Sequence, residues 1–230
     1  MEETQKCLKD LIVFSLLEDK EVKSICQKAY ERKYNKGEII FFEDDSEKKL
    51  YFLTEGKVKL TMMSPEGKEK VLTILQEGDI FGEISLFDED PHPLSAEVQE
   101  ECKLLIVSWK DLESVILNNP SLALKLITAL AKKTRLLASQ VRELVFHDAE
   151  GRLAALLNRF SRQFGFETEK GTIIEVILTH QEIANLLGTS RVTVTKLMNK
   201  FIKNGIIKIK ERKIVIQDKK KLEDKVKGSN

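Results

Sequence analysis

The segment from residue 178 to 201 constrains the fold of this chain more than any other stretch. Thr179 and Glu182 form a T-x-x-E pattern, which is typical of a helix start because each side chain can bond the backbone N–H of the other residue. An apolar stripe follows, and Gly188 after it permits the left-handed backbone that ends a helix. The pattern predicts a short helix followed by a tight turn.

A second helix is predicted to begin after Thr189 or Ser190, and it has two different faces. The inward face is apolar and holds Val194, Leu197, Met198 and Phe201. The opposite face is basic and polar and holds Arg191, Val192, Thr193, Thr195, Lys196 and Lys200. Two helices joined in this way are typical of a helix-turn-helix, which places its second helix in the major groove of DNA. The alternative is an ordinary helical hairpin with a solvated charged face.

A basic β-hairpin is predicted directly after the second helix. Gly205 ends that helix, and two short apolar runs follow at residues 206–209 and 213–217. The polar link Lys210-Glu211-Arg212 between them is short enough for a hairpin turn. Another strand is expected at residues 172–178, before the first helix. Together these elements predict a winged helix-turn-helix.

Charge is distributed unevenly along the chain, although the whole carries a formal charge of only +1. Residues 147–230 contain 17 Lys and Arg against 10 Asp and Glu, a net charge of +7, and residues 1–146 contain 21 against 27, a net charge of −6. A basic C-terminal part attracts DNA phosphates. The Lys-rich end of the chain, KKKLEDKVKGSN, is expected to be simply solvated.

The N-terminal half predicts an antiparallel β-structure. A helix is expected over residues 11–34, and the pattern then changes to short apolar runs separated by turn residues such as Glu55-Gly56. The runs are residues 39–42, 50–53, 58–63, 71–75, 80–81, 96–98 and 104–107. Six or more short strands at this spacing are typical of a sandwich or barrel.

Helical periodicity returns at Trp109, and Pro120 opens a long helix that is expected to run to about Phe146. Within it, seam positions alternate in steps of four and three, at Leu130, Thr134, Leu137, Val141 and Leu144. This spacing is the a/d seam of a coiled coil and predicts a parallel homodimer. The alternative is a helix packed only on its own domain, which is the expected role of Leu126 and Ile127.

The predicted hinge between the two halves of the chain is Phe146-His147-Asp148, because Asp148 can cap the next helix. The apolar face of that helix holds Leu153, Leu156, Leu157, Phe160 and Phe164. We therefore expect a sensor domain with flanking helices over residues 1–118. A dimerisation helix with the hinge follows over residues 119–147, and a DNA-binding domain over residues 148–230.

Composition and motif content disfavour several classes of protein. No run of about eighteen apolar residues is present, and the polar N-terminus does not resemble a secretory signal, so no membrane segment is expected. The three cysteines are widely spaced and odd in number, which fits a reducing cytoplasm. The histidines are unpaired, and no nucleophile-elbow, Walker or zinc-spacing motif occurs, so neither an enzyme nor a metal site is predicted.

A second motif lies in the predicted β-domain, where Phe81-Gly82-Glu83-Ile84-Ser85-Leu86-Phe87 is followed by Leu94-Ser95-Ala96. It resembles the phosphate-binding cassette of the CRP/FNR family, G-E-x-x-L followed by R-S-A after a short loop. The segment of the second helix at residues 191–196 is also similar to that family, and the resemblance covers about residues 12–218. It implies an α+β fold with an antiparallel β-roll, a long dimerisation helix and a C-terminal winged helix-turn-helix.

For function, the resemblance implies a transcription regulator. A homodimer would bind a near-palindromic site on double-stranded DNA, one half-site per subunit, and would contact RNA polymerase. A small effector or redox cofactor would sit between the β-roll and the long helix and favour one orientation of the recognition helices. The implied effector-binding positions are Gly82, Glu83, Ile84, Ser85, Leu94, Ser95, Lys133, Leu137 and Ala138.

This chain departs from the cyclic-AMP-binding members of the family at the position just before Ser95. Those members have an arginine that pairs with the cyclic phosphate, whereas Leu94 offers a buried anion no charge-assisted hydrogen bond. Leu137 and Ala138 stand where polar residues normally touch the purine. We therefore predict no resident cofactor and poor binding of cyclic AMP. The alternatives are an uncharged or apolar effector, no effector, or a carboxylate bound by Lys132, Lys133 or Arg135.

The loop Pro91-His92-Pro93 leaves further alternatives open. Its stiff tip could pre-fill the effector pocket, or His92 could be a haem ligand in a gas sensor, although a lone loop histidine is expected to be exposed. A redox cluster is disfavoured because Cys7 and Cys26 have no C-x-x-C spacing. The basic winged domain argues against a ligand-binding module without DNA binding.

Different roles are expected for the residues that would meet DNA. Arg191 and Lys196 are predicted to read base edges, and Val192 can touch a thymine methyl group. Phosphates are predicted to be held, without specifying sequence, by Thr179, His180, Gln181, Ser190 and Thr193.

Overall fold

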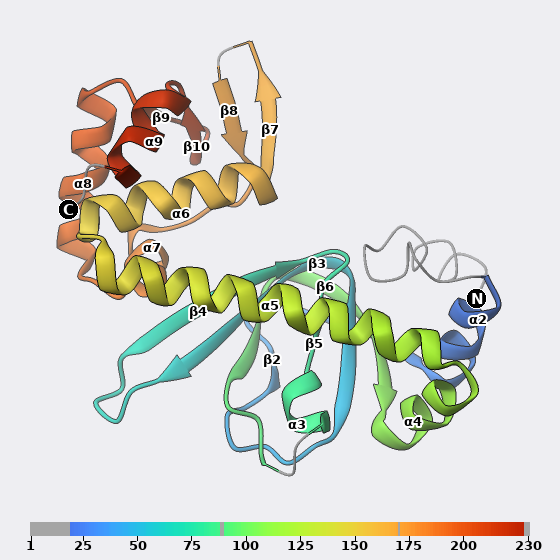
Figure 1. Cartoon of the computed structure of the whole chain (residues 1–230). Coiled ribbons are helices and arrows are strands. Elements are labelled where there is room, and N and C mark those ends of the chain that lie inside the picture. Colours follow the sequence, from blue (N-terminus) through green and yellow to red (C-terminus); the bar gives the residue numbers. More distant parts are fainter. Residues whose placement is uncertain (1–18, 88–89, 170, 228–230) are drawn as a thin grey trace. The chain divides into compact units, whose positions relative to one another are not determined.

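The computed structural model describes residues 19–87, 90–169 and 171–227. It divides the chain into two compact units, Met1–Thr134 and Arg135–Asn230 (Figure 1). The division falls inside the long helix α5 (Pro120–Phe146), which begins at the proline as predicted. Each unit has its own antiparallel sheet.

The first unit is built on a six-stranded sheet. Its strands are β1 (Tyr30–Tyr34), β2 (Ile39–Phe41), β3 (Lys49–Met63), β4 (Glu69–Gln76), β5 (Ile80–Phe81) and β6 (Ser95–Ser108). The order is β1-β6-β3-β4, with β2 paired to β6 and β5 paired to β3, and these pairings are all antiparallel. The predicted antiparallel β-structure is confirmed.

Gly56 lies inside a strand and not in the turn that the sequence predicts. The runs at 50–53 and 58–63 form one strand, β3, whose register with β6 shifts around Gly56. Gly56 has φ 87°, and a Cβ there would lie 2.1 Å from the carbonyl oxygen of Glu101. The prediction was wrong because a glycine at a bulge and close backbone approach gives the same sequence signal as a glycine in a turn.

The helix predicted over residues 11–34 is also wrong in its second part. Helix α2 (Asp19–Lys28) ends at Lys28, and Tyr30–Tyr34 forms strand β1, which pairs with β6. Only Tyr34 of this strand is buried, so its sequence YERKY lacks the apolar alternation that indicates a strand. Residues 11–18 lie outside the described part of the chain.

Both faces of the central strands are buried because successive side chains point to opposite sides of a sheet. In β3, Tyr51 and Leu53 enter the interior of the roll, whereas Leu50 and Phe52 face the helices. The helix-side core also holds Ile25 of α2, Leu112 of α4 (Trp109–Asn118), and Leu122 and Leu126 of α5. This core anchors the start of the long helix to the roll.

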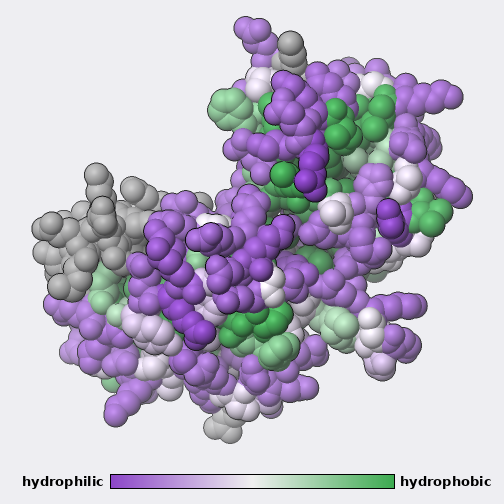
Figure 2. Space-filling view, turned by 180° about the vertical axis from the view of Figure 1, so that it is seen from behind, coloured by the Kyte–Doolittle hydropathy of each residue, from purple (hydrophilic) through white to green (hydrophobic). Residues whose placement is uncertain are grey.

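Helix α5 leaves its first core contacts and becomes largely exposed. Ile127 is 59% exposed, so the prediction that it packs on its own domain was wrong. In the described residues no single helix is long and apolar enough to cross a membrane, and α4 with α5 meets that test only as a pair bent by 119°. The molecular face in Figure 2 is mainly hydrophilic, with separate hydrophobic patches reaching the surface.

The second unit combines helices with a four-stranded antiparallel sheet of order β7-β8-β10-β9. Its elements are α6 (Ala149–Gln163), β7 (Gly165–Thr168), β8 (Gly171–Ile174), α7 (His180–Leu187), α8 (Arg191–Lys203), β9 (Ile207–Lys210), β10 (Lys213–Ile216) and α9 (Lys219–Lys227). Asp148 caps α6, and the predicted apolar face of α6 is buried. Strand β8 is shorter than predicted, and its partner β7 was not predicted.

The C-terminal end is a further correction. Residues Lys219–Lys227 form helix α9, which packs against α6. Leu222 has no exposed surface, so the prediction of a solvated tail was wrong for this segment. One buried leucine among lysines is too weak an apolar pattern to indicate a packed helix.

Candidate functional site

The helix-turn-helix forms as the sequence predicts. The Thr179 hydroxyl accepts a hydrogen bond from the Glu182 N–H at 3.1 Å, and the Glu182 carboxylate accepts one from the Thr179 N–H at 2.7 Å. Gly188 ends α7 with φ 65° and ψ 46°. Ser190 then caps α8 by accepting a hydrogen bond from the Thr193 N–H at 3.1 Å. These caps define where α8 begins, and therefore which side chains its first turn presents.

The outer face of α8 is open. Arg191 and Lys196 are exposed, and neither side chain makes an ion pair with a residue in the described ranges. Val192 between them is 64% exposed. The buried side of the helix holds Val194, Met198 and Phe201. The first turns of α8 thus present two free cations and one apolar side chain.

Other predicted DNA contacts already have partners within the unit. The Thr195 hydroxyl donates to the Arg191 carbonyl oxygen at 2.9 Å, and its oxygen lies 2.9 Å from Nδ1 of His180. The Gln181 side-chain amide donates to Oδ1 of Asn185 at 2.8 Å. The contact between His180 and Thr195 joins α7 to α8, whereas the other two bonds lie within one helix. Contact of these groups with DNA stays a prediction.

Lys200 is held by an ion pair that the sequence does not reveal. Its Nζ contacts Oε2 of Glu150 on α6, and Oε1 of Glu150 lies 3.0 Å from Nζ of Lys225 on α9. Burial raises the pKa of the Glu150 carboxyl, but hydrogen bonds from the two lysines outweigh it and hold that pKa below its usual value. The pair ties α8 to α6 and α9, and a DNA contact by Lys200 stays a prediction.

The β9–β10 hairpin forms a basic wing. Glu211 and Arg212 at its tip have φ 51° and 64°, the left-handed values that a two-residue hairpin turn requires. Lys210 and Lys213 face each other across this turn. The predicted hairpin is confirmed.

The cassette is built around Gly82 and Glu83. Gly82 has φ 85°, and a Cβ there would lie 2.5 Å from the Lys49 carbonyl oxygen. Glu83 begins helix α3 (Glu83–Phe87) and is only 5% exposed. Nζ of Lys133, on α5, lies 2.7 Å from Oε1 of Glu83 and 2.6 Å from the Ile80 carbonyl oxygen. The predicted effector residues Glu83 and Lys133 therefore pair with each other.

His92 is buried, so the prediction of an exposed loop histidine was wrong. The residue is 2% exposed, and its ring stacks on Phe41 with 3.9 Å between ring centroids. Nε2 lies 3.0 Å from the Glu47 carbonyl oxygen and must donate to it, because a carbonyl oxygen only accepts. The Ser85 hydroxyl oxygen lies 3.1 Å from both ring nitrogens. The His92 N–H donates to the Asp45 carbonyl oxygen at 2.9 Å, and this hydrogen bond holds the loop against the connection between β2 and β3. Burial lowers the pKa of His92.

The remaining predicted effector positions differ in environment. Leu94 packs against the inner core of the roll, and the Ser95 hydroxyl accepts a backbone hydrogen bond at 2.9 Å from the β2–β3 connection. Ile84 is 42% exposed. Leu137 and Ala138 are exposed residues of the second unit. The structure thus brings the cassette residues together, whereas an effector contact by Leu137 and Ala138 stays a prediction.

The predicted dimer seam follows one side of α5. Leu130 is half-buried and Thr134 is exposed. Leu137, Val141 and Leu144 are 48%, 59% and 50% exposed. Large apolar side chains exposed in a regular row form a surface that a partner helix can cover.

The two thiols in the described residues are poorly suited to hold a metal cluster. Burial raises the pKa of Cys26, and it raises the pKa of Cys102 to about 12, which disfavours the thiolate that would be a ligand. Cys7 lies outside the described residues. Within the described ranges no group of three His, Cys, Asp or Glu residues could hold a metal ion.

An antiparallel β-roll, a long helix and a winged helix-turn-helix with an open basic face define a class of DNA-binding regulator. A model of the cyclic nucleotide-binding domain matches residues 31–119, and a model of the Crp-like helix-turn-helix domain matches residues 151–225. The chain belongs to the CRP/FNR family of transcription regulators. Members with this helix-turn-helix bind DNA and act as dimers, and the family is not one of enzymes.

Similar proteins cover nearly the whole chain. The CRP-like cAMP-activated global transcriptional regulator of Mycobacterium tuberculosis is 31% identical over 212 residues, 91% of this chain and 94% of that protein. The anaerobic regulatory protein of Bacillus subtilis is 31% identical over 190 residues, 82% of this chain and 80% of that protein. The solved structure of a CooA mutant from Carboxydothermus hydrogenoformans has a TM-score of 0.76 and 27% identity, and covers 87% of this chain and 88% of that one.

Proposed function

We propose that this protein is a sequence-specific regulator that binds a near-palindromic DNA site. The observation that carries the proposal is the outer face of α8, where Arg191, Val192 and Lys196 are exposed directly after a well-formed cap. This face would enter the major groove. The basic hairpin and the net charge of residues 147–230 would attract the phosphates.

The regulator would act as a homodimer along the exposed seam of α5, so that each subunit reads one half-site. Residues 1–118 would sense a signal, residues 119–147 would dimerise and form the hinge, and residues 148–230 would bind DNA. The bound dimer would contact RNA polymerase, as the family resemblance implies.

The signal would not be cyclic AMP. Leu94 provides no cation for the cyclic phosphate, and the buried carboxylate of Glu83 already has Lys133 as its partner at 2.7 Å. His92 occupies the space between Phe41 and Ser85, with both ring nitrogens engaged, which does not suit a haem ligand. These contacts favour an uncharged effector, or none, over an anionic one.

Selection from random duplex DNA by the full-length protein, with no ligand added, tests the proposal. We expect enrichment of a two-fold-symmetric site with half-sites roughly 10 bp apart. The double variant Arg191→Ala/Lys196→Ala should enrich nothing. Lys36→Ala/Lys110→Ala removes two exposed lysines from the first unit and should select the same site as the unmodified protein. Failure to enrich any site, without ligand and again with small-molecule cell extract added, would contradict the proposal.

Calorimetric titration with cyclic AMP tests the effector part separately. The unmodified protein should give no binding heat, and Leu94→Arg should gain affinity because it supplies a charge partner for the phosphate. Micromolar affinity of the unmodified protein would show that the effector argument is wrong.

A further inference from the structure

A pocket of about 470 Å³ lies in the second unit between the C-terminal part of α5 and α6. Its volume is within the range of small-molecule sites. Ser139 and Glu143 line it from α5, and Asn158, Arg159 and Arg162 line it from α6. It is separate from the cassette, which belongs to the first unit.

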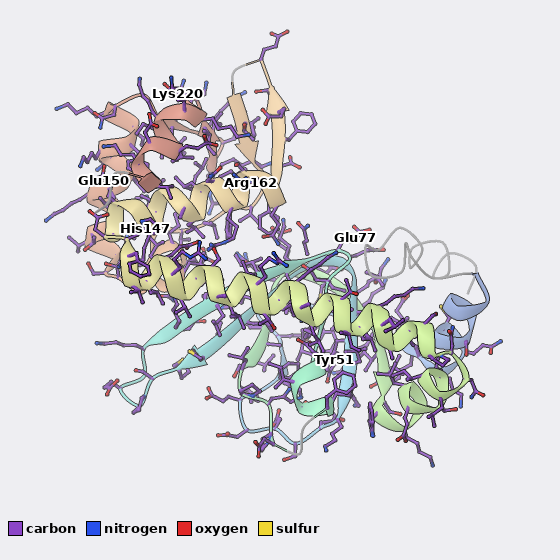
Figure 3. The ribbon with its side chains drawn as sticks, viewed as in Figure 1. Tyr51, Glu77, His147, Glu150, Arg162 and Lys220 are labelled. Atoms are coloured by element: carbon purple, nitrogen blue, oxygen red, sulfur yellow. The ribbon has the colours of Figure 1, made fainter. Side chains whose placement is uncertain are left out.

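The pocket has one positive charge without a partner. Nη1 of Arg159 donates to both carboxylate oxygens of Glu143, at 2.9 and 3.2 Å, so this pair is neutral. Arg162, labelled on α6 in Figure 3, is exposed and makes no ion pair with any residue that the structure describes. An anion in the pocket would therefore find an available guanidinium.

One residue of the pocket lining, Asn158, has a hydrogen-bond acceptor without a donor among the residues that the structure describes. Its Oδ1 is buried and accepts no hydrogen bond from the described part of the chain. A buried polar atom left without a partner destabilises the folded protein, so most such atoms are satisfied by protein, water or ligand. A ligand that carries an O–H or N–H group could supply the donor.

We propose that this pocket binds a small organic anion that also carries a hydrogen-bond donor, such as a phosphorylated or carboxylated polyol. Its anionic group pairs with the guanidinium of Arg162, which suits planar bidentate recognition of carboxylate and phosphate. Asn158 lines the pocket, and a rotation of its side chain would bring Oδ1 within reach of the ligand's hydroxyl group. The neutral Arg159–Glu143 pair offers no net positive charge to a second anionic group.

The pocket stays accessible in the homodimer proposed above. At 100° per residue, Ser139 and Glu143 lie roughly 130–170° around α5 from the mean direction of the seam residues Leu137, Val141 and Leu144. A partner helix on the seam therefore covers the opposite side of α5. A ligand in the pocket contacts helices on both sides of the 147–148 hinge and can favour one hinge geometry.

Calorimetry on the full-length protein tests the proposal, with glycerol 3-phosphate and sulfate as probes at matched ionic strength. Both probes are anions, but only glycerol 3-phosphate carries hydroxyl donors. We expect glycerol 3-phosphate to bind, and Arg162→Gln to weaken its binding by about tenfold or more. Lys220→Gln is the matched control, because it removes one exposed charge from α9 outside the pocket, and it should leave binding unchanged (Figure 3).

Three outcomes would overturn the proposal: no binding heat from the unmodified protein at millimolar glycerol 3-phosphate, equal binding by Arg162→Gln, or an equal loss in Lys220→Gln. Sulfate binding as tightly as glycerol 3-phosphate would overturn the role of Asn158. An effect of the ligand on DNA affinity rests on the proposed function, whereas the calorimetry does not. A failure of DNA binding is therefore distinguishable from a failure of the pocket.

Discussion

The buried ring of His92 joins its loop to the cassette helix and to the core of the roll. Replacing it by alanine removes the stack on Phe41, the hydrogen bond to the Glu47 carbonyl and the polar contact with Ser85. We expect His92→Ala to lower the free energy of unfolding of the first unit by about 2–4 kcal/mol. Urea unfolding followed by the fluorescence of Trp109, the single tryptophan, measures this.

The variant His92→Phe is the control, because it keeps an aromatic ring on Phe41 and removes only the polar contacts. It should lose less stability than His92→Ala. An unchanged urea midpoint in His92→Ala would show that the ring contributes no net stability.

Titration of His92 should make the stability of the first unit depend on pH. Burial lowers its pKa below the ordinary 6.5, against the opposing charges of Asp45, Glu47 and Glu83. The unfolded chain then binds more protons, so the free energy of unfolding falls as pH drops from about 6.5 toward the folded pKa. His92→Phe should flatten this slope when urea midpoints are compared across that range. The same slope in both proteins would contradict the assignment to His92.

Arg191 should contribute to sequence discrimination as well as to affinity. Its guanidinium can bond guanine at two atoms, so Arg191→Ala should cost about 1–3 kcal/mol on the selected site and relax one base position. Competition binding with all single-base variants of the site measures this. Lys203→Ala, an exposed lysine at the other end of α8, is the control and should leave the base preferences unchanged. Equal weakening on every sequence would make Arg191 a phosphate contact.

At the scale of elements, a helix or strand could be predicted from the sequence where the group that determines its structure lies only a few residues away along the chain. The caps at Thr179 and Ser190 act on residues three positions away, and the sequence located both helices from them. The strand at Gly56 depends on the carbonyl of Glu101, and helix α9 on burial of Leu222. Neither partner is visible in the local pattern.

The candidate site shows the same contrast between local signals, which could be read from the sequence, and long-range contacts, which could not. The glycine and glutamate of the cassette were predictable as a motif, whereas the partners of Glu83, His92 and Lys200 lie 45 to 50 residues away along the chain. Periodicity and capping signals extend over only a few residues. The long-range ion pairs and the burial of the His92 loop therefore could not be predicted from the sequence.

The bulge that keeps β3 a single strand gives a prediction with an internal control. Gly56→Ala places a Cβ 2.1 Å from the Glu101 carbonyl oxygen, whereas Gly67 has a similar φ of 76° with nothing within 4 Å of an added Cβ. We expect Gly56→Ala to cost about 3 kcal/mol or more and Gly67→Ala about 1 kcal/mol. Urea unfolding followed by Trp109 fluorescence compares them. Equal losses would mean that the backbone at Gly56 relaxes without cost.

At the scale of the whole molecule, α5 connects the separate tasks of the chain. Its start is anchored in the core of the first unit through Leu122 and Leu126, and Lys133 bonds the cassette. The exposed apolar residues of the seam follow from Leu137 onward, and Glu143 pairs with Arg159 of α6. A change at the cassette can thus reach the seam and the hinge through one continuous helix, provided that the two ends favour different states.

Dimerisation through this helix should be required for tight DNA binding. Val141→Glu would place two like charges against each other in a parallel seam, a juxtaposition that costs several kcal/mol. The variant should therefore sediment as a monomer where the unmodified protein is a dimer. It should also lose affinity for the full site, because a monomer contacts one half-site only. Ser139→Glu introduces the same residue on the opposite side of α5 and should remain dimeric. A dimeric Val141→Glu would place the subunit interface elsewhere, since a buried pair of glutamates without cations cannot be accommodated in the seam.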